Sequence, residues 1–255
     1  MSSISVKDPW IQRPRPRPGA RLRLLMLPHA GGGASAFRGW ADLLPDEVEV
    51  CPVQLPGREN RVREPAFDRL QPLVEALAGV LAGWRDLPWA MFGHSNGALI
   101  AFELARHAAR TGAPGPVHLF ASGRRAPDVP SRQRDVHGLP EGELIDELRT
   151  LGGMPQALLD HPELLQLVLP VLRADMAMTE TYTPTPGATV DVPITACTGL
   201  WDGKVSEDEA RAWGRHTTAG FRLRTFPGDH FYLFAERDAV IQALSADLRS
   251  IVSAL

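Results

Sequence analysis

The sequence predicts an α/β fold in which a mostly parallel sheet is covered by helices on both faces. From residue 21 onward, short apolar runs typical of strands alternate with helical patterns, as in parallel strands joined by helices. Most of the short runs lack polar alternation, as strands do when both of their faces are buried. One stretch, from about Leu139 to Tyr182, has no strand pattern and interrupts the alternation.

The elements follow from these patterns in chain order. Strands are expected at residues 21–29, 47–53, 89–94, 117–123, 193–199 and 221–226. Helices are expected at residues 35–44, 70–84, 98–111 and about 236–254. A shorter amphipathic helix is expected in "EDEARAWGRH", and His216 at its end is expected to be exposed. In the interrupting stretch, Gly153, Pro155 and Pro162 separate two or three helices. We interpret it as a helical insertion between two strands, a lid at about residues 135–185 over one end of the sheet.

The chain ahead of the first strand has a different character. The segment "RPRPRPG" at residues 13–19 cannot be a helix, because each proline removes a hydrogen-bond donor and restricts the residue before it. It predicts a semi-rigid extended tail, with a proline-rich docking motif as the alternative. We therefore divide the chain into a Pro/Arg-rich tail at residues 1–20 and a single domain at residues 21–255.

Composition and charge exclude several classes of protein. The chain has 255 residues, 44% hydrophobic and 22% charged, and its net charge of −3 gives no strong attraction to nucleic acid or anionic membranes. The apolar run at residues 22–27 is too short to span a bilayer, and the N-terminus lacks the pattern of a signal peptide. Cys51 and Cys197 lie in apolar runs, which favours free thiols in a reducing compartment. We expect a cytoplasmic monomer.

The stretch "GHSNG" at residues 93–97 lies between a predicted strand and a predicted helix. It matches G-x-S-x-G, in which a serine occupies a tight, strained strand-to-helix turn. Side chains two residues before and after the serine would crowd that turn, which explains Gly93 and Gly97. The hydroxyl of Ser95 would then stand at the tip of the turn, near the positive end of a helix dipole. The pattern predicts a nucleophile at Ser95, and an ordinary glycine-rich turn is the alternative.

A serine hydroxyl needs a base to accept its proton. In folds with this turn the chain order is serine, acid, histidine, which excludes His29 and His94. His230 lies in a glycine-containing loop between the last strand and the last helix, where the base is expected. The remaining histidines belong to helices, to the insertion or to other surface and packing positions: His107, His118, His137, His161 and His216.

The acid that orients the histidine should follow a strand between Ser95 and His230. Asp202 does so directly after the strand at residues 193–199, although a solvated turn aspartate is the alternative reading. Asp208 and Glu209 lie at the start of the next helix, where capping or interaction with the helix dipole explains them. Asp229 adjoins His230, but a sequence neighbour rarely points back correctly at the ring.

Two backbone N–H groups are expected to hold a developing oxyanion. One is that of Asn96, after the serine, and the other is that of Ala30 in "LPHAGGGASAF" at residues 27–37, where three glycines keep the backbone accessible. His29 is expected to fix this loop through a hydrogen bond. Together these features predict an α/β-hydrolase fold whose catalytic residues are Ser95, Asp202 and His230, with no metal and no cofactor of its own.

Several stretches, in order, resemble the type II thioesterases of polyketide and nonribosomal peptide synthesis. They are "LPHAGGGASAF", "QLPGRENRVREPAF", "GHSNGALIAFELA", "LPVLRADMAMTETY" and "FPGDHFYLF", and the resemblance runs from about residue 21 to 250. It implies a stand-alone enzyme that removes stalled or wrong acyl groups from the phosphopantetheine arm of acyl or peptidyl carrier proteins. It also implies that Ser95, Asp202 and His230 are the triad, and that the insertion is a mobile lid over the acyl chamber.

One residue departs from the family pattern, and rival functions stay open. The family commonly has methionine where this chain has Asn96, whose side chain would either make the acyl pocket more polar or bond only to nearby backbone. A carboxylesterase or lipase would use the same triad, and a non-catalytic carrier-binding module would have no need of all three residues. Acidic carriers would require a basic patch, for which a loop beside the insertion offers Arg124, Arg125, Arg132 and Arg134; a solvated loop is the alternative.

Overall fold

A six-stranded parallel sheet forms the centre of the molecule. The computed structural model describes residues 8–84, 86–151 and 161–255. The strands are β1 (Leu22–Leu27), β2 (Val48–Pro52), β3 (Trp89–His94), β4 (Leu119–Ser122), β5 (Ile194–Gly199) and β6 (Phe221–Phe226). Their order across the sheet is β2-β1-β3-β4-β5-β6, and every neighbouring pair is parallel. Each strand falls within its predicted range, which confirms the mostly parallel sheet.

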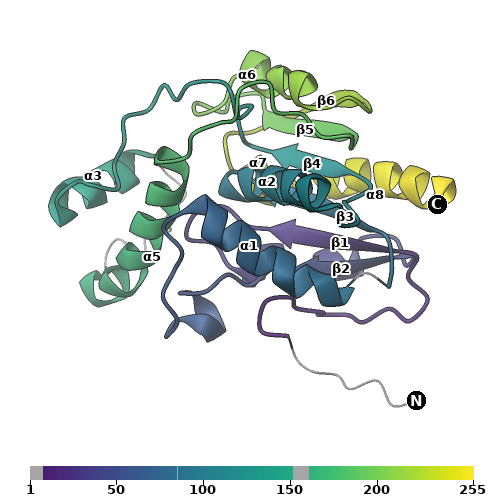
Figure 1. Ribbon diagram of the computed structural model, residues 1–255. Helices are drawn as coiled ribbons and strands as arrows, with labels where there is room; N and C mark the ends of the chain where they lie inside the picture. The colour runs from purple at the N-terminus through teal and green to yellow at the C-terminus, as the bar shows by residue number, and fades with distance from the viewer. Residues whose placement is uncertain (1–7, 85, 152–160) are drawn as a thin grey trace.

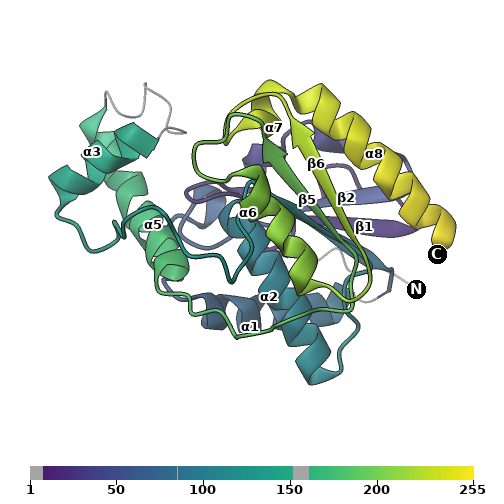
Figure 2. The same ribbon diagram turned by 90° about the horizontal axis from the view of Figure 1, so that it is seen from above.

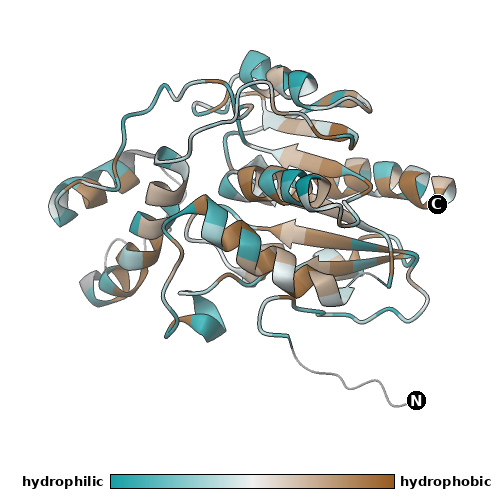
Figure 3. Ribbon diagram, in the orientation of Figure 1, coloured by the Kyte–Doolittle hydropathy of each residue, from teal (hydrophilic) through white to brown (hydrophobic). Residues whose placement is uncertain are grey.

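Helices cover both faces of this sheet (Figures 1 and 2). On one face lie α1 (Leu70–Leu81), α2 (Asn96–Thr111) and α6 (Glu207–Arg211), and on the other lies α8 (Arg237–Ala254), which follows the short α7 (Tyr232–Ala235). Each face has its own apolar core: Phe102 and Trp213 belong to the first, and Trp40 and Phe92 to the second. The strands β1 to β5 are buried along their whole length and are mostly apolar (Figure 3), because both of their faces are covered, whereas the edge strand β6 is only partly buried.

The insertion between β4 and β5 contains α3 (Glu141–Leu151) and α5 (Pro162–Glu180). Both figures show these helices beyond one end of the strands, away from the C-terminus of the chain. They share a small apolar cluster of their own, in which Leu144 and Leu148 of α3 pack with Leu165 and Leu169 of α5. Of the two or three helices expected in this stretch, the one between Pro155 and Pro162 falls mostly outside the described residues. The other two helices expected in this stretch are present.

The prediction of one helix at residues 35–44 is wrong. Two short 3₁₀ turns, Ala34–Phe37 and Trp40–Asp42, occupy this stretch instead. Gly39 separates them with a φ of 81°, in the left-handed region that a continuous helix cannot contain. The apolar residues still face the core, with Phe37 and Trp40 fully buried, so their spacing resembled that of a helix without forming one.

Residues 8–20 lie against the edge of the sheet at β2. Ile11 pairs with Val53 in an antiparallel bridge, and Arg13 forms an ion pair with the buried carboxylate of Glu49. The side chain of Arg17 is buried and donates to backbone carbonyls, among them that of Ala41 at 2.6 Å. None of the helices in the described ranges is both long and apolar enough to cross a membrane.

Candidate active site

Ser95 occupies the sharp turn between β3 and α2. Its φ of 55° and ψ of −112° lie outside the ordinary regions for a residue with a side chain, so the backbone is strained there. A Cβ atom on Gly93 would lie 2.2 Å from the carbonyl oxygen of Gly97, and one on Gly97 would lie 2.1 Å from that of Leu27. Both glycines are therefore needed for close backbone approach.

Asp202 and His230 meet at the ends of two neighbouring strands. Asp202 follows β5 and His230 follows β6, and Asp202 Oδ2 lies 2.8 Å from His230 Nδ1. The other oxygen, Oδ1, accepts hydrogen bonds from the backbone N–H groups of Lys204 at 2.8 Å and Val205 at 3.2 Å. The carboxylate is fully buried, so it fixes the ring with Nδ1 protonated and leaves Nε2 available to accept a proton.

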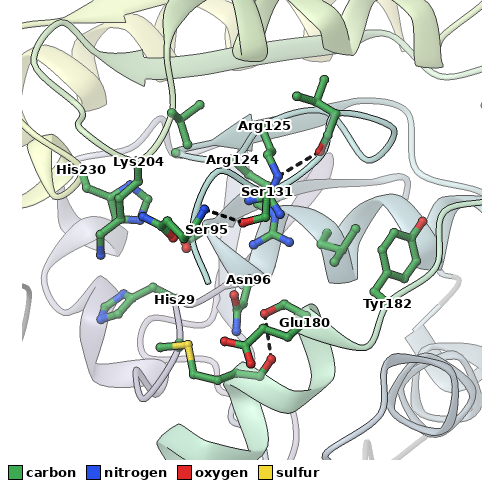
Figure 4. A pocket seen from close by; sticks show the side chains of 18 of the residues that line it. His29, Ser95, Asn96, Arg124, Arg125, Ser131, Glu180, Tyr182, Lys204 and His230 are labelled. Carbon is green, nitrogen blue, oxygen red and sulfur yellow. Dashed lines mark hydrogen bonds between the residues drawn. The ribbon is translucent and has the colours of Figure 1, made fainter. Parts of the chain in front are cut away.

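Ser95 and His230 line one cavity of about 570 Å³. Figure 4 shows both side chains there, together with Asn96. No hydrogen bond joins Ser95 Oγ to the His230 ring in this structure, and such bonds commonly tighten only when substrate binds. The wall on the side of the insertion is mostly apolar and includes Leu148, Val168, Leu172 and Met176. The space therefore offers a serine, a histidine and an apolar chamber that would accept an acyl chain.

The other carboxylates that the sequence offered have different partners. Glu209 closes a capping box with Ser206 at the start of α6, as the capping explanation predicted. Asp229 is exposed, and its Oδ1 accepts a hydrogen bond from the N–H of Phe231 at 2.8 Å. Asp202 is the only one of these three acids that contacts His230.

Two residues beside Ser95 have backbone N–H groups without an acceptor among the described residues. They are Ala30 and Asn96, which both line the cavity. Ala30 lies in a tight turn, in which the N–H of Gly32 donates to the carbonyl of His29 at 3.0 Å. An oxyanion site requires free N–H groups beside the serine, and the assignment of this role to Ala30 and Asn96 stays a prediction.

The predicted roles of two histidines are wrong. His29 Nδ1 is buried and has no hydrogen-bond partner among the described residues; the ring instead packs edge-on against Phe231 and Phe234. His216 is buried rather than exposed, and its two ring nitrogens lie 2.7 Å from Asp128 Oδ1 and 2.8 Å from the carbonyl oxygen of Ala188. His216 ends a short helix, and the turn that follows directs its side chain into the protein. The periodicity of the helix does not predict the direction of that turn.

The surroundings of the cavity favour neutral histidines. Burial, and then the charge of His230, lowers the pKa of His29 to about 4 and that of His94 well below its ordinary value. His94 Nδ1 lies 2.8 Å from Ser122 Oγ, which lies 2.6 Å from the hydroxyl of Tyr232. These buried hydrogen bonds connect β3 and β4 to Tyr232, two residues after His230. The three residues are isolated polar positions in apolar stretches, so the sequence gives little indication that they interact.

Asn96 and Arg124 contribute polar groups to the same cavity. The amide of Asn96 bonds to backbone, although that backbone is distant in sequence: its Nδ2 donates to the carbonyl of Asp175 on α5 at 3.0 Å. The guanidinium of Arg124 has no hydrogen-bond or ion-pair partner among the described residues, and burial lowers its pKa to about 9. Arg124 therefore lines the cavity, and its part in a docking patch stays a prediction.

The other three arginines of the expected basic patch have partners. Arg125 is half-buried and donates to the carbonyl of Val129 at 3.0 Å. Arg132 and Arg134 are exposed and form ion pairs with Glu209 and Glu147, respectively. These pairs reduce the net positive charge at this surface, and a docking role for Arg132 and Arg134 stays a prediction.

Comparisons with known proteins agree with this geometry. A family model described as "Thioesterase domain" matches residues 22–248. The gramicidin S biosynthesis protein GrsT of Aneurinibacillus migulanus is 40% identical over 253 residues, which cover 99% of each chain. The structure of RedJ, a thioesterase from the prodiginine pathway of Streptomyces coelicolor, is 42% identical, with a TM-score of 0.83 over 92% of this chain and 91% of that one. The type II thioesterase BorB, from the borrelidin cluster, is 39% identical, with a TM-score of 0.81 over 95% of this chain and 97% of that one.

The α/β-hydrolase fold and the resemblance that the motifs indicated are thereby confirmed. The chain belongs to the thioesterase family as a type II enzyme that hydrolyses thioesters.

Proposed function

We propose that this enzyme releases stalled or aberrant acyl groups from the phosphopantetheine arm of carrier proteins, through a covalent intermediate on Ser95. The observation that carries the proposal is the cavity in which strained Ser95 lies beside His230, whose ring is held by the buried carboxylate of Asp202. A nucleophile, a base and an orienting acid in this order are what acyl transfer through serine requires.

The first half-reaction would form an acyl-enzyme. Ser95 Oγ attacks the thioester carbonyl carbon while His230 Nε2 accepts the hydroxyl proton, and the carbonyl oxygen becomes an oxyanion held by the N–H groups of Ala30 and Asn96. Collapse breaks the carbon–sulfur bond, and His230 returns the proton to the departing pantetheine sulfur. Asp202 remains ionised and stabilises the imidazolium in between.

The second half-reaction would restore the enzyme. A water molecule gives a proton to His230 and attacks the acyl carbon, and the oxyanion forms again at the same two N–H groups. Ser95 Oγ then leaves with the proton from His230, and the carboxylic acid is released. The apolar lining from the insertion would hold the acyl chain during both steps.

The proposed partner rests on the relatives. GrsT is named for gramicidin S biosynthesis, and the sources of RedJ and BorB are biosynthetic pathways or clusters. In such assembly lines the growing chain is carried as a thioester on carrier proteins, so these proteins are the substrates that the proposal requires. A cytoplasmic location, a monomeric state, the absence of nucleic-acid partners and independence from metals and cofactors stay predictions from the sequence.

The test is hydrolysis of a panel of acyl groups loaded on one carrier protein, followed by mass spectrometry of the carrier. The wild-type enzyme should return the carrier to its free-thiol form, and should act more slowly on small oxygen esters of the same acids. Rapid hydrolysis of oxygen esters with no release from the carrier would instead indicate a carboxylesterase or lipase. Stable binding of the carrier without release would indicate a binding module.

A further inference from the structure

A buried ion pair joins the insertion to the loop after β2. Asp175 of α5 and Arg58, from the loop after β2, have side chains only 4% and 6% exposed. Two parallel hydrogen bonds link them: Arg58 Nη1 lies 2.7 Å from Asp175 Oδ2, and Arg58 Nη2 lies 2.9 Å from Oδ1. Such a paired, planar contact fixes the orientation of both groups as well as their separation.

The same carboxylate also binds the backbone beside Ala30. Asp175 Oδ2 accepts a hydrogen bond from the N–H of Gly31 at 2.7 Å, while Arg58 Nη1 donates to the carbonyl of Gly32 at 3.2 Å. Among the described residues, these two contacts and the local turn between His29 and Gly32 are the hydrogen bonds of residues 29–32. A side chain of the insertion thus holds the Ala30–Gly31 peptide, which directly follows the peptide that carries the Ala30 N–H.

Asp175 also reaches the second donor, through its backbone. Its carbonyl accepts the hydrogen bond from Asn96 Nδ2 at 3.0 Å, and Asn96, which lines the cavity, carries the other free N–H. Asp175 therefore contacts both parts of the proposed oxyanion site. Its side chain binds Gly31, which follows Ala30, and its carbonyl binds the side chain of Asn96.

The ion pair also has an electrostatic consequence. A carboxylate this close to the loop would repel an oxyanion held at Ala30 if its charge were uncompensated. The bidentate Arg58 supplies that compensation in a buried, weakly screening environment. Loss of either partner would therefore disturb the site through charge as well as through geometry.

We propose that Asp175 is a positioning residue for the oxyanion site, and that the inner half of α5 is a fixed wall of the active site rather than a swinging lid. The proposal rests on the proposed hydrolysis at Ser95. Pro170 cannot donate the helical hydrogen bond, and it lies between Asp175 and the leucines Leu165 and Leu169 that pack on α3. Leu172, on the Asp175 side of Pro170, belongs to the same apolar cluster.

The test compares Asp175→Asn with Asp247→Asn, which removes another buried carboxylate that binds two arginines, Arg222 and Arg224, between β6 and α8. With a small acyl thioester as substrate, Asp175→Asn should lower kcat about 100-fold, in the range seen for loss of one oxyanion donor, and change KM little. Inhibition by a trifluoromethyl ketone, which forms a tetrahedral oxyanion on the serine, should weaken by a similar factor. Asp247→Asn should lower the melting temperature yet keep kcat per folded molecule.

Arg58→Lys is the second variant, and it tests the positioning role of the Arg58–Asp175 pair if Asp175→Asn does not fold. It retains the charge but loses the bidentate geometry, so kcat and trifluoromethyl ketone affinity should fall about tenfold. Unchanged kcat and inhibitor affinity in the folded variants, or an equal loss in Asp247→Asn, would overturn the proposal. Labelling of wild-type Ser95 by a fluorophosphonate separates this result from failure of the proposed function: a labelled, active wild type with a fully active Asp175→Asn contradicts only the role of Asp175.

Discussion

The carboxyl edge of the sheet and the helical insertion are held in different ways. At the edge, backbone hydrogen bonds tie successive strand ends together: the N–H of Ser95 donates to Ser122, and the N–H of Trp201 donates to Gly228. The insertion has a small core of leucines and reaches the edge through side chains, above all that of Asp175. The edge supplies the reacting groups, and the insertion supplies much of the apolar cavity wall.

This difference assigns separate tasks to the two regions. Changes at the edge should lower the rate for every substrate, because they alter the groups that break and form bonds. Changes in the insertion, or in residues that contact it, should alter which acyl chains fit. Asp175 is the exception, since it belongs to the insertion but contacts the edge.

The largest effect is expected at the edge, for Ser95→Ala. Removal of the hydroxyl should lower the rate on the order of 10⁴-fold or more for all acyl chains, because no nucleophile remains. Circular dichroism should show an unchanged fold, since alanine is no larger than serine. A rate within tenfold of wild type would contradict the assignment of the nucleophile.

Asp202→Asn should lower kcat by up to about 10⁴-fold, again for all substrates. Asparagine retains the shape but favours the imidazole tautomer that cannot accept the serine proton. Asp229→Asn is the matched control, because this exposed neighbour of His230 binds only the nearby backbone in the described structure. Equal activity of the two variants would show that another group orients His230.

Acid should destabilise the protein through His118, a partly buried histidine directly before β4. Burial lowers the pKa of His118 to about 4, whereas the unfolded chain has the ordinary value of 6.5. The unfolded state therefore binds the proton first as pH falls, and stability is lost between pH 6.5 and 4, by roughly 2–3 kcal/mol. His118→Gln should lose less stability than wild type between pH 7 and 4.5 in denaturant titrations. Parallel losses would mean that His118 does not contribute.

Asn96→Met tests whether a residue at the edge can also affect substrate selection, because the side chain of Asn96 contacts the insertion. The substitution keeps the backbone N–H and removes the amide from the cavity. It should favour longer apolar acyl chains over short or polar ones by roughly 1–3 kcal/mol, the size expected for one group in a pocket. Rates over a series of acyl thioesters measure this. Identical acyl-chain profiles for the two enzymes would exclude a polar contribution from the amide.

The smallest effect is expected at the surface beside the insertion. Arg132→Glu with Arg134→Glu should raise KM for carrier-bound substrates by about threefold to tenfold and leave small thioesters unaffected, because exposed charges act on docking. Arg249→Glu is the control, because this exposed arginine lies in the last turns of α8, and Figure 1 shows the C-terminal end of α8 far from the insertion. Equal effects on both substrate types would indicate a structural role for the two arginines.

The sequence predicts the edge better than the insertion for a physical reason. The turn at Ser95 needs glycines at fixed spacings, and the loops with Asp202 and His230 directly follow apolar strands, so local patterns locate these residues. The Arg58–Asp175 pair spans 117 residues and has no local signal. At residues 35–44 the local pattern was present but predicted the wrong structure. The core-facing residues of two short turns have the spacing of a helix, and only the positive φ of Gly39 shows that the helix is interrupted.

The most direct measurement of the central claim is the trapping of an acyl group on the enzyme. An acylated carrier protein is mixed with the wild-type enzyme, the reaction is stopped with acid within milliseconds to seconds, and the enzyme is digested for mass spectrometry. The account predicts one acyl adduct, on the peptide that contains Ser95, which disappears as free acid accumulates and is absent from Ser95→Ala. Release of acid from the carrier with an adduct on another residue, or undiminished release by Ser95→Ala, would contradict it.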